Sequence, residues 1–492
     1  MKNSAKNFYG DDNIENNAIS EKLDFSTKLA YGAGDLGPAI TGNVSIFFLL
    51  IFFTNVAGIP AGLAGSILMV GKIWDGINDP IVGLLTDNTK STRWGRRLPW
   101  LFYGAIPFGI FFFLQWIVPP FSNNPNNNIW ALFWYYVLIG IIGQALYTVV
   151  SLPYTAMTPE LTHDYDERTS LNSFRFTFSI SGSILCLILA KIVFDVVPDP
   201  QYQYIVLASV CTIISILSLY WCVFGTKQRV LLMENNRLQT QEETENIPFL
   251  TQIKIAFSNK PFLFVIGIYL CSWLGVQVTA SIIPYFVVYC MNMKNADVPT
   301  VMIAVQATAL IMLFFWSNLS KKVGKKTVYF LGMSLWIIAA GGLFFLQPHQ
   351  ITLMYIMAIM AGFGVSTAYL IPWSMIPDVI ELDELQTGQR REGIFYGFMV
   401  LLQKFGLALG LFLVGNALQT SGFKESIGGV NIIQPDSALF AIRVAVGPIP
   451  TICLILGLIL TYFYPITREM HAEIMLQLAE KHQKNKHKPT TK

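Results

Sequence analysis

The sequence predicts an all-α membrane protein whose twelve transmembrane helices form two halves of six. Three observations predict this class. Of the 492 residues, 53% are hydrophobic and 13% are charged, whereas a soluble globular chain has about 25% charged residues. Apolar stretches of membrane-spanning length recur along the chain, and basic residues gather in alternate connections between them. A single soluble core does not reach this size with such a composition.

Twelve segments contain the roughly 20 mostly apolar residues that a membrane-spanning helix needs. We expect helices because a lipid-exposed strand outside a closed barrel would leave its backbone groups unpaired. In chain order the predicted spans are 29–56, 62–86, 98–118, 129–155, 170–195, 203–225, 262–290, 299–318, 327–346, 351–376, 393–419 and 438–465.

The spans divide the chain into five parts. We predict a polar N-terminal extension (1–28), a first six-helix bundle (29–225), a polar linker (226–261), a second bundle (262–465) and a tail that begins as an amphipathic helix (466–492). A faint repeat supports this division, because WGRRLPWLF and VGKKTVYFL each follow the second span of a half. Two linked six-helix halves are the plan of major facilitator transporters, which bind substrate between the halves.

Basic residues predict the orientation, because they are enriched in cytoplasmic loops. They concentrate in connections that follow even-numbered spans, namely Lys90, Arg93, Arg96, Arg97, Lys321, Lys322, Lys325, Lys326, Arg390 and Arg391. The opposite connections PPFSNNPNNN and VPDPQ have no basic residue, although Lys294 and Lys424 are exceptions. We therefore expect a multi-pass protein of the plasma (cell inner) membrane with both termini in the cytoplasm.

The stretch KIWDGINDP places charges inside the second predicted span. At 100° per residue, Lys72, Asp75 and Asp79 fall within an arc of roughly 60°, and Asn78 widens it to about 120°. Each such charge costs about 2.5–3.5 kcal/mol at the bilayer centre, so these side chains must face the bundle interior. They could form a site for a cation or a proton, or a structural ion pair.

Ionisable residues in three other spans extend this polar interior. Asp35 lies in the first span, Arg175 near the start of the fifth and Lys404 deep in the eleventh. Arg175 could instead extend to the membrane surface, as basic residues near helix ends do. Trp373 and Tyr154 are candidates for stacking on a sugar ring, although most aromatic residues of this chain serve packing or the membrane interface.

Two polar connections contain a second charged set, which we assign as a candidate gate. The candidates are Arg168, Asp378, Asp383, Glu384, Arg390 and Arg391. In the functional interpretation they form salt bridges between the halves that close the inward side. The alternative is an ordinary solvated surface.

The sequence contains no pattern for covalent chemistry. Its six cysteines lie in apolar segments without CxxC spacing, and its five histidines form no ligand cluster. A nucleotide-binding loop and a catalytic triad are also absent from the sequence pattern. We therefore expect no enzymatic activity, no cofactor and no metal beyond a possible transported Na⁺.

Four stretches together resemble the glycoside–pentoside–hexuronide:cation symporter family, of which melibiose permease is a member. They are KIWDGINDPIVGLLTDNTKSTRWGRRLPW, YTVVSLPYTAM, DERTSLNSFR and PDVIELDELQTGQRREGIFYGFMVLLQKFG. The resemblance covers about residues 28 to 465. It implies the major facilitator fold and transport coupled to Na⁺, Li⁺ or H⁺.

The resemblance also implies roles for single positions. Asp75, Asn78 and Asp79 match the family's cation ligands on the second helix, and Thr148 matches a hydroxyl ligand on the fourth. Lys72 stands where some members have arginine, and we include it in the substrate site.

The sugar-binding residues of melibiose permease match Asp35, Arg175 and Lys404. Ser151 stands where that protein has an acid, and this departure argues against melibiose itself. Another glycoside, a pentoside, a uronide or a sugar-like anion stays open. With Tyr154 and Trp373, these residues complete the predicted substrate site.

We therefore expect a symporter that moves a sugar or glycoside together with Na⁺ or H⁺ by alternating access. The expected partners are this solute, the cation and the lipid bilayer, with no nucleic acid, and the expected state is a monomer. A lysolipid or other amphiphile is the alternative cargo, as in animal relatives, and a sugar sensor that does not transport is an alternative of another class. A wide apolar slot between the halves would favour the amphiphile, and a small polar cavity would favour the sugar.

Overall fold

The structure is a computed structural model that describes residues 22–87, 89, 94–122, 124–162, 165–239, 249–388, 392–425 and 432–486. Within these residues every regular element is a helix. Ten helices are long and apolar enough to cross a membrane. Two others complete the predicted set: α2 (Ala61–Asp87), which is interrupted by charges, and α3 (Leu98–Leu114), which has 17 residues. The predicted all-α class is confirmed.

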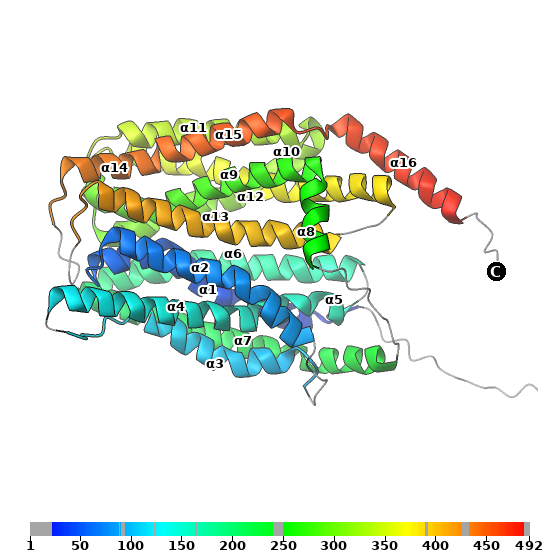
Figure 1. Ribbon diagram of the computed structural model, residues 1–492, viewed down its shortest axis with the longest axis horizontal. Coiled ribbons are helices and arrows are strands. Elements are labelled where there is room, and N and C mark those ends of the chain that lie inside the picture. Colours follow the sequence, from blue (N-terminus) through cyan, green and yellow to red (C-terminus); the bar gives the residue numbers. More distant parts are fainter. Residues whose placement is uncertain are drawn as a thin grey trace, which may run out of the picture.

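The helices form two groups (Figure 1). The first half contains α1 (Phe25–Asn55), α2, α3, α4 (Pro125–Ala156), α5 (Thr158–Leu161), α6 (Tyr165–Val196) and α7 (Pro200–Gln239). The second half contains α9 (Lys260–Tyr285), the π turn η1 (Phe286–Cys290), the 3₁₀ turn η2 (Asn295–Asp297), α10 (Val298–Val323), α11 (Lys325–Phe345), α12 (Ile351–Thr387), α13 (Glu392–Thr420), α14 (Asp436–Val446) and α15 (Pro448–Phe463).

The halves meet along three pairs of helices, in which α2 packs on α13, α6 on α10 and α1 on α9. Both α1 and α9 run from one end of the bundle to the other. We call the end where α1 begins the terminal end, because the tail helix α16 (Arg468–Lys486) and the short helix α8 (Phe249–Ser258) also lie there (Figure 1). The opposite end, where α1 finishes at Asn55, is the far end.

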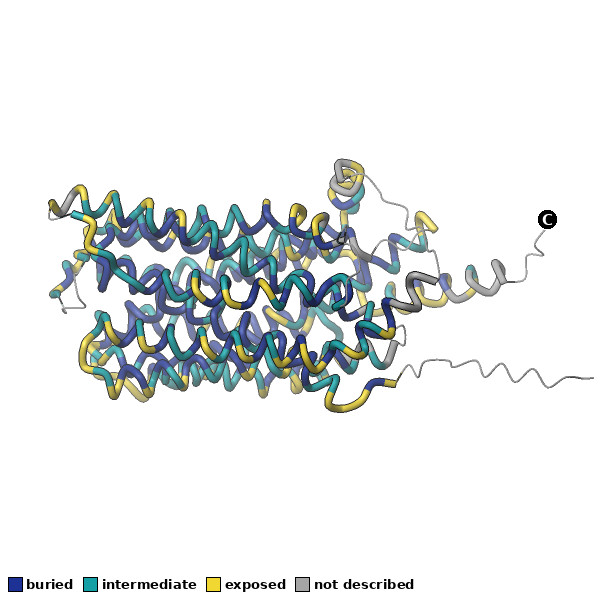
Figure 2. Tube along the Cα trace, turned by 90° about the horizontal axis from the view of Figure 1, so that it is seen from below, coloured by how far each residue is buried: buried dark blue, intermediate teal, exposed yellow. Residues whose placement is uncertain are grey.

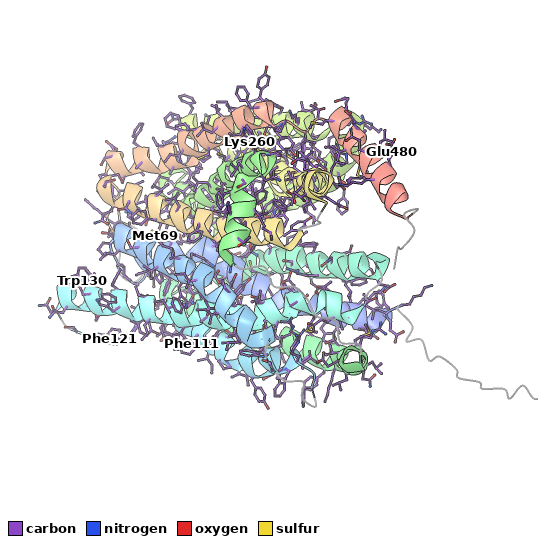
Figure 3. The ribbon with its side chains drawn as sticks, turned by 45° about the vertical axis from the view of Figure 1, so that its right-hand side comes forward. Met69, Phe111, Phe121, Trp130, Lys260 and Glu480 are labelled. Atoms are coloured by element: carbon purple, nitrogen blue, oxygen red, sulfur yellow. The ribbon has the colours of Figure 1, made fainter. Side chains whose placement is uncertain are left out.

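The outer surface of the bundle is apolar in the way a lipid-facing surface requires. Along α2, Ile77, Ile81 and Leu85 are about half exposed, and Ile77 lies on the face opposite Asp75. Buried residues follow the inside of the helices and exposed ones the outside (Figure 2). The exposed aromatic residues Phe121 and Trp130 lie at the far end (Figure 3), as interface residues of membrane proteins do.

The polar connection predicted between the spans 351–376 and 393–419 is helical for most of its length. Helix α12 continues to Thr387, well beyond the predicted end of its span, and finishes at Gly388 with a left-handed backbone (φ 75°). Val379 and Ile380 explain the extension, because both are buried in the core of the second half. The candidate gate acids therefore lie on a helix.

The last predicted span is broken into two helices, α14 and α15, at Gly447. Pro448 and Pro450 follow at the start of α15, where proline is tolerated because the first helical N–H groups have no intrahelical acceptor. The polar linker is also partly helical, because α7 continues to Gln239 and α8 precedes α9. A helix is present at the predicted position in the tail, namely α16, in which Ile474 and Leu478 are buried.

Candidate cation and solute site

A cavity of about 1700 Å³ lies between the two halves. Its wall includes residues of α1, α2, α4 and α6 from the first half and of α9, α10, α12 and α13 from the second. Ligand pockets commonly have about 300–1,000 Å³, so this cavity is large. Much of its wall is apolar, with Ile46, Phe47, Leu152, Phe176, Ile180, Val305, Leu313, Phe314 and Leu401 among the lining residues.

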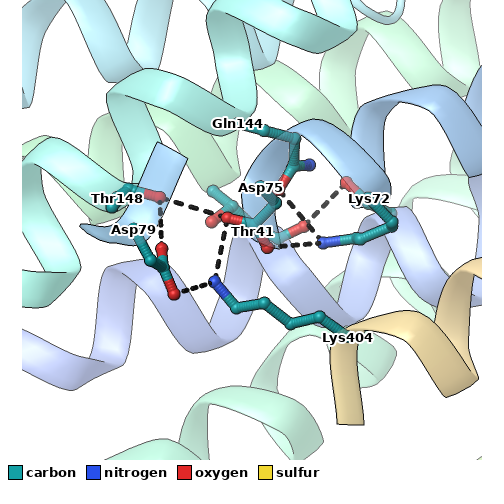
Figure 4. A network of polar contacts seen from close by, with 8 residues as sticks. Thr41, Lys72, Asp75, Asp79, Gln144, Thr148 and Lys404 are labelled. Atoms are coloured by element: carbon teal, nitrogen blue, oxygen red, sulfur yellow. Dashed lines mark hydrogen bonds and ion pairs between the residues drawn. The ribbon is translucent and has the colours of Figure 1, made fainter. Parts of the chain in front are cut away.

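The two aspartates of α2 meet at one hydroxyl group of α4. Asp75 and Asp79 are one helical turn apart on α2 and both line the cavity. The Oγ1 atom of Thr148 lies 3.1 Å from Oδ1 of each carboxylate (Figure 4). Asp75 is almost completely buried and Asp79 is partly exposed. Both carboxylates therefore face the interior of the bundle, as predicted.

Two lysines neutralise these carboxylates, and they come from opposite halves of the molecule (Figure 4). Lys404 on α13 places its Nζ 2.5 Å from Asp79 Oδ2 and 3.1 Å from Asp75 Oδ1. Lys72 on α2 lies 3.9 Å from Asp75 and donates to Gln144 Oε1 at 3.1 Å. The Lys404 ammonium therefore occupies the side of the carboxylates that faces the second half.

A second ion pair lines the cavity on the first half. Arg175 Nε on α6 lies 3.5 Å from Asp35 Oδ2 on α1. Arg175 therefore points into the cavity and does not extend to the membrane surface. Tyr154 lies behind the cavity wall, where its hydroxyl donates to Tyr31 O and its ring lies 5.9 Å from the Arg175 guanidinium. This placement corrects the predicted substrate contact for Tyr154, which supports Arg175 instead.

The other two predicted substrate residues line the cavity. Ser151 is on α4, seven residues after Gln144 and three after Thr148, so the three side chains share a helix face. Trp373 on α12 stacks on Tyr396 of α13, with ring centroids 6.1 Å apart and an angle of 23° between the planes. An aromatic wall from the second half therefore faces polar groups of the first half across the cavity.

Gln144 was not predicted from the sequence, and the structure does not place the predicted ligand Asn78 in the cavity wall. Gln144 precedes Thr148 by four residues, and this spacing on one helix is the signal that could have identified it. Asn78 is buried, but it is not among the cavity-lining residues, and its amide nitrogen has no partner within the described part of the chain. Its role as a cation ligand stays a prediction.

Polar contacts and close packing join the halves at the far end. Thr54 Oγ1 lies 2.8 Å from the Tyr285 hydroxyl, and Asn55 donates to Tyr289 at 2.6 Å. Thr54, Tyr285 and the neighbouring Phe53 are almost completely buried. Beside them, α2 and α13 cross so closely that a Cβ atom on Gly415 would lie 2.5 Å from the carbonyl oxygen of Ala61. The far end is therefore sealed.

The candidate gate acids are at the terminal end, but the described partners of one of them are in its own half. Asp378 is buried and binds Lys325 Nζ at 2.6 Å and His471 Nε2 at 3.4 Å. His471, on α16, also lies 2.6 Å from Glu381 Oε2. In this conformation the described partners of Asp378 therefore lie within the second half, and the predicted salt bridge between the halves is not among them.

The other gate candidates are only partly described. Asp383 is buried near the Asn259 amide, and Glu384 lies one residue further along α12. The side chain of Arg168 and both Arg390 and Arg391 lie outside the described residues. Their part in a gate stays a prediction.

Comparison with known proteins assigns the family. Residues 30–468 match the family described as MFS/sugar transport protein. The chain belongs to this family. It is 51% identical to an uncharacterized symporter of Synechocystis sp. over 95% of this chain and 98% of the relative. It is also 26% identical to the sodium-dependent lysophosphatidylcholine symporter 1 of Mus musculus, over 91% of this chain and 87% of the relative.

Solved structures agree on the fold. The nucleoside transporter NupG superposes with a TM-score of 0.61 at 12% sequence identity, over 89% of this chain and 98% of that structure. At this identity the likeness concerns the fold alone. The family match, the symporter relatives and this fold together identify the chain as a major facilitator protein of the symporter type. They do not assign its transported solute.

Proposed function

We propose that the protein is a symporter that couples the movement of a cation to that of a small organic solute by alternating access. The observation that carries this proposal is the cluster of Asp75, Asp79 and Thr148, which faces a cavity between the halves and is closed on its open side by Lys404 from the other half. The contacts of Lys404 with Asp75 and Asp79 must change whenever the halves move relative to each other.

The coupling cation is Na⁺ or H⁺, and Asp75 and Asp79 bind it. Carboxylate and hydroxyl oxygens are ligands that hard cations prefer, and carboxylates also accept protons. Asn78 is a further candidate ligand after a small rearrangement of α2. A bound cation competes with the Lys404 ammonium for the same oxygens, so cation binding frees Lys404. Coupling between the two sites follows and must be reciprocal.

The described conformation is sealed at the far end, so solute would exchange at the terminal end. We propose that this end faces the cytoplasm of the plasma membrane, as the basic residues of the loops predict. Closure of the terminal end in the opposite conformation would bring α12, with Asp383 and Glu384, toward Arg168 on α6. The gate assignment rests on this movement.

The first candidate solute is a sugar or glycoside, in keeping with the glycoside–pentoside–hexuronide resemblance. The aromatic wall of Trp373 and Tyr396 supports this candidate, because sugar rings stack on such surfaces, and Asp35, Arg175 and Ser151 offer hydrogen bonds opposite it. A lysolipid or other amphiphile is the second candidate. The large volume and largely apolar wall of the cavity favour it, and the mouse relative is named for such a solute.

Transport by the purified protein in proteoliposomes tests the proposal. We expect solute accumulation above equilibrium when a Na⁺ or H⁺ gradient is imposed, and its loss in Asp75→Cys and Asp79→Cys, with some solute binding retained. A membrane sensor would bind solute without accumulating it. Unchanged concentrative uptake in both variants would rule out the proposed cation site.

A further inference from the structure

Three side chains at the terminal end have the chemistry of a metal site. Among the described residues, one group of three His, Cys, Asp or Glu side chains has ligand atoms that all lie within 4.8 Å of one another, and it consists of Asp378, Glu381 and His471. The two carboxylates are three residues apart on α12 and therefore share a helix face. The imidazole comes from α16, which packs on α12. The group is separate from the cavity between the halves, since none of its members lines that cavity.

The distances within this group fit a zinc ion after a small adjustment. His471 Nε2 lies 3.4 Å from Asp378 Oδ1 and 2.6 Å from Glu381 Oε2. The ligand atoms of a tetrahedral zinc ion, each about 2.0–2.1 Å from the metal, are about 3.3 Å apart. The first distance is already close to this value, and the second requires a movement of about 0.7 Å. Glu381 and His471 have room to move because their side chains are 18% and 34% exposed, and water can provide a fourth ligand.

Lys325 holds the buried carboxylate of the group in position. Its Nζ lies 2.6 Å from Asp378 Oδ1 and 2.7 Å from Asp378 Oδ2, and it also donates to Ser374 O at 2.6 Å. A metal ion at Oδ1 leaves the contact between Lys325 and Oδ2 in place, and carboxylates that bind metals are commonly hydrogen-bonded in this way. The Lys325 ammonium neutralises one of the two carboxylates. The charge of Glu381 is therefore the one that a bound cation compensates.

A salt bridge to a protonated imidazole is the alternative use of the same group. Imidazole side chains change charge between about pH 5 and 8, so Glu381 and His471 form an ion pair only when a proton is bound. A divalent metal compensates Glu381 without that proton and binds the lone pair of the neutral ring. A mixed set of imidazole and carboxylate ligands suits Zn²⁺, whereas Mg²⁺ and Ca²⁺ prefer oxygen ligands alone.

The rest of the tail helix holds the imidazole over α12. Ile474 and Leu478, which follow His471 on α16, are buried in the core of the second half. Further along the helix, Lys481 donates to Leu385 O near the end of α12 at 2.9 Å. The three ligands are therefore close together before a metal binds, and this preorganisation lowers the entropic cost of binding.

We infer that Asp378, Glu381 and His471 bind a divalent transition metal, of which Zn²⁺ fits best, and that this metal joins the tail helix α16 to α12. The site is distinct from the proposed site of the coupling cation, and the inference does not rest on the proposed function. The metal acts as a structural link, because all three ligands belong to the second half or dock on it. The sequence did not indicate the site, since His471 lies 90 residues from Glu381.

Zinc binding to the purified full chain tests the inference. The protein is treated with EDTA and titrated with ZnCl₂, and bound zinc is measured by elemental analysis. We expect one zinc ion per chain, a higher melting temperature and slower hydrogen exchange over 468–486. His471→Ala should weaken zinc binding by at least about tenfold. The control His349→Ala, which changes an exposed histidine outside the group, should bind zinc as the wild type does.

Two further substitutions of His471 separate a metal site from a salt bridge. His471→Cys replaces one zinc ligand by another and should keep the slowing of hydrogen exchange by zinc. His471→Lys keeps a positive charge beside Glu381 but has no free lone pair at neutral pH, so it should lose the response to zinc. The opposite pattern in folded variants would overturn the inference, as would zinc binding that is unchanged in His471→Ala or absent from the wild type. Circular dichroism establishes that each variant is folded.

Discussion

Two clusters in this molecule have the same chemical make-up but different places in the fold. The central cluster contains Asp75 and Asp79 with Lys72 and Lys404. The terminal cluster contains Asp378 and Glu381 with Lys325 and His471. Each joins two carboxylates to two nitrogen bases over distances of 2.5–3.9 Å.

The difference is which helices each cluster connects. The central cluster joins α2 of the first half to α13 of the second, whereas the terminal cluster joins α11, α12 and α16, which all belong to or dock on the second half. Alternating access moves one half against the other. Contacts of the central cluster must therefore change during transport, and those of the terminal cluster move together and can only brace one half.

The largest expected difference compares one acid from each cluster. Asp79→Asn should reduce cation-driven uptake to background, because it replaces a carboxylate ligand of the cation by a neutral amide and leaves Lys404 with one carboxylate partner. Asp378→Asn should retain cation-driven uptake per folded molecule but lower the melting temperature, since Lys325 loses its carboxylate partner. Uptake and melting curves on the same preparations check both outcomes. The comparison fails if Asp378→Asn uncouples transport as strongly as Asp79→Asn.

The next largest effect concerns close packing between the halves. Gly415→Ala places a methyl group against the backbone of α2 at Ala61, and such overpacking costs about 1–3 kcal/mol. The far-end-sealed conformation should become less populated. A cysteine introduced at Ala57 should then react faster with a membrane-impermeant maleimide added to that side. The control is Gly341→Ala, where no atom lies within 4 Å of the new Cβ.

A smaller shift is expected from one hydroxyl group. Tyr285→Phe removes the hydrogen bond to Thr54 across the far end, which contributes about 1 kcal/mol and changes the balance of conformations about fivefold. Tyr329→Phe is the matched control, because it removes a buried hydrogen bond to Ser272 within the second half. Both variants should lose similar stability, but only Tyr285→Phe should expose the cysteine at position 57. Equal exposure in both would show that the effect is not specific to contacts between halves.

The smallest effect on transport is expected at the tail helix. His471→Ala removes the contacts of α16 with Asp378 and Glu381, while Ile474 and Leu478 stay buried against the second half. Hydrogen exchange over 468–486 should increase, with uptake changed by less than about twofold. Gln477→Ala, at an exposed position of the same helix, serves as the control and should change neither. A large loss of uptake in His471→Ala would show that the tail takes part in the transport cycle.

Several features of the site could be predicted because they depend on local sequence. The period of the α-helix places Asp75 and Asp79 on one face of α2, and the cost of exposing charge to lipid turns that face inward. Thr148 was predicted from resemblance, and the structure places it between the two carboxylates. Tyr154 was misplaced because an aromatic residue near a site has the same local pattern whether it lines a cavity or packs behind it.

The membrane class, the helical content and the side chains that must avoid lipid follow from local sequence, because hydropathy and helix period act over one or two turns. Which charges meet depends on how the helices pack. Lys404 and Asp79 are 325 residues apart, and nothing in the local pattern of either helix specifies that pair rather than another. The same holds for His471 and Glu381, 90 residues apart, since both pairings arise only when whole helices pack against each other.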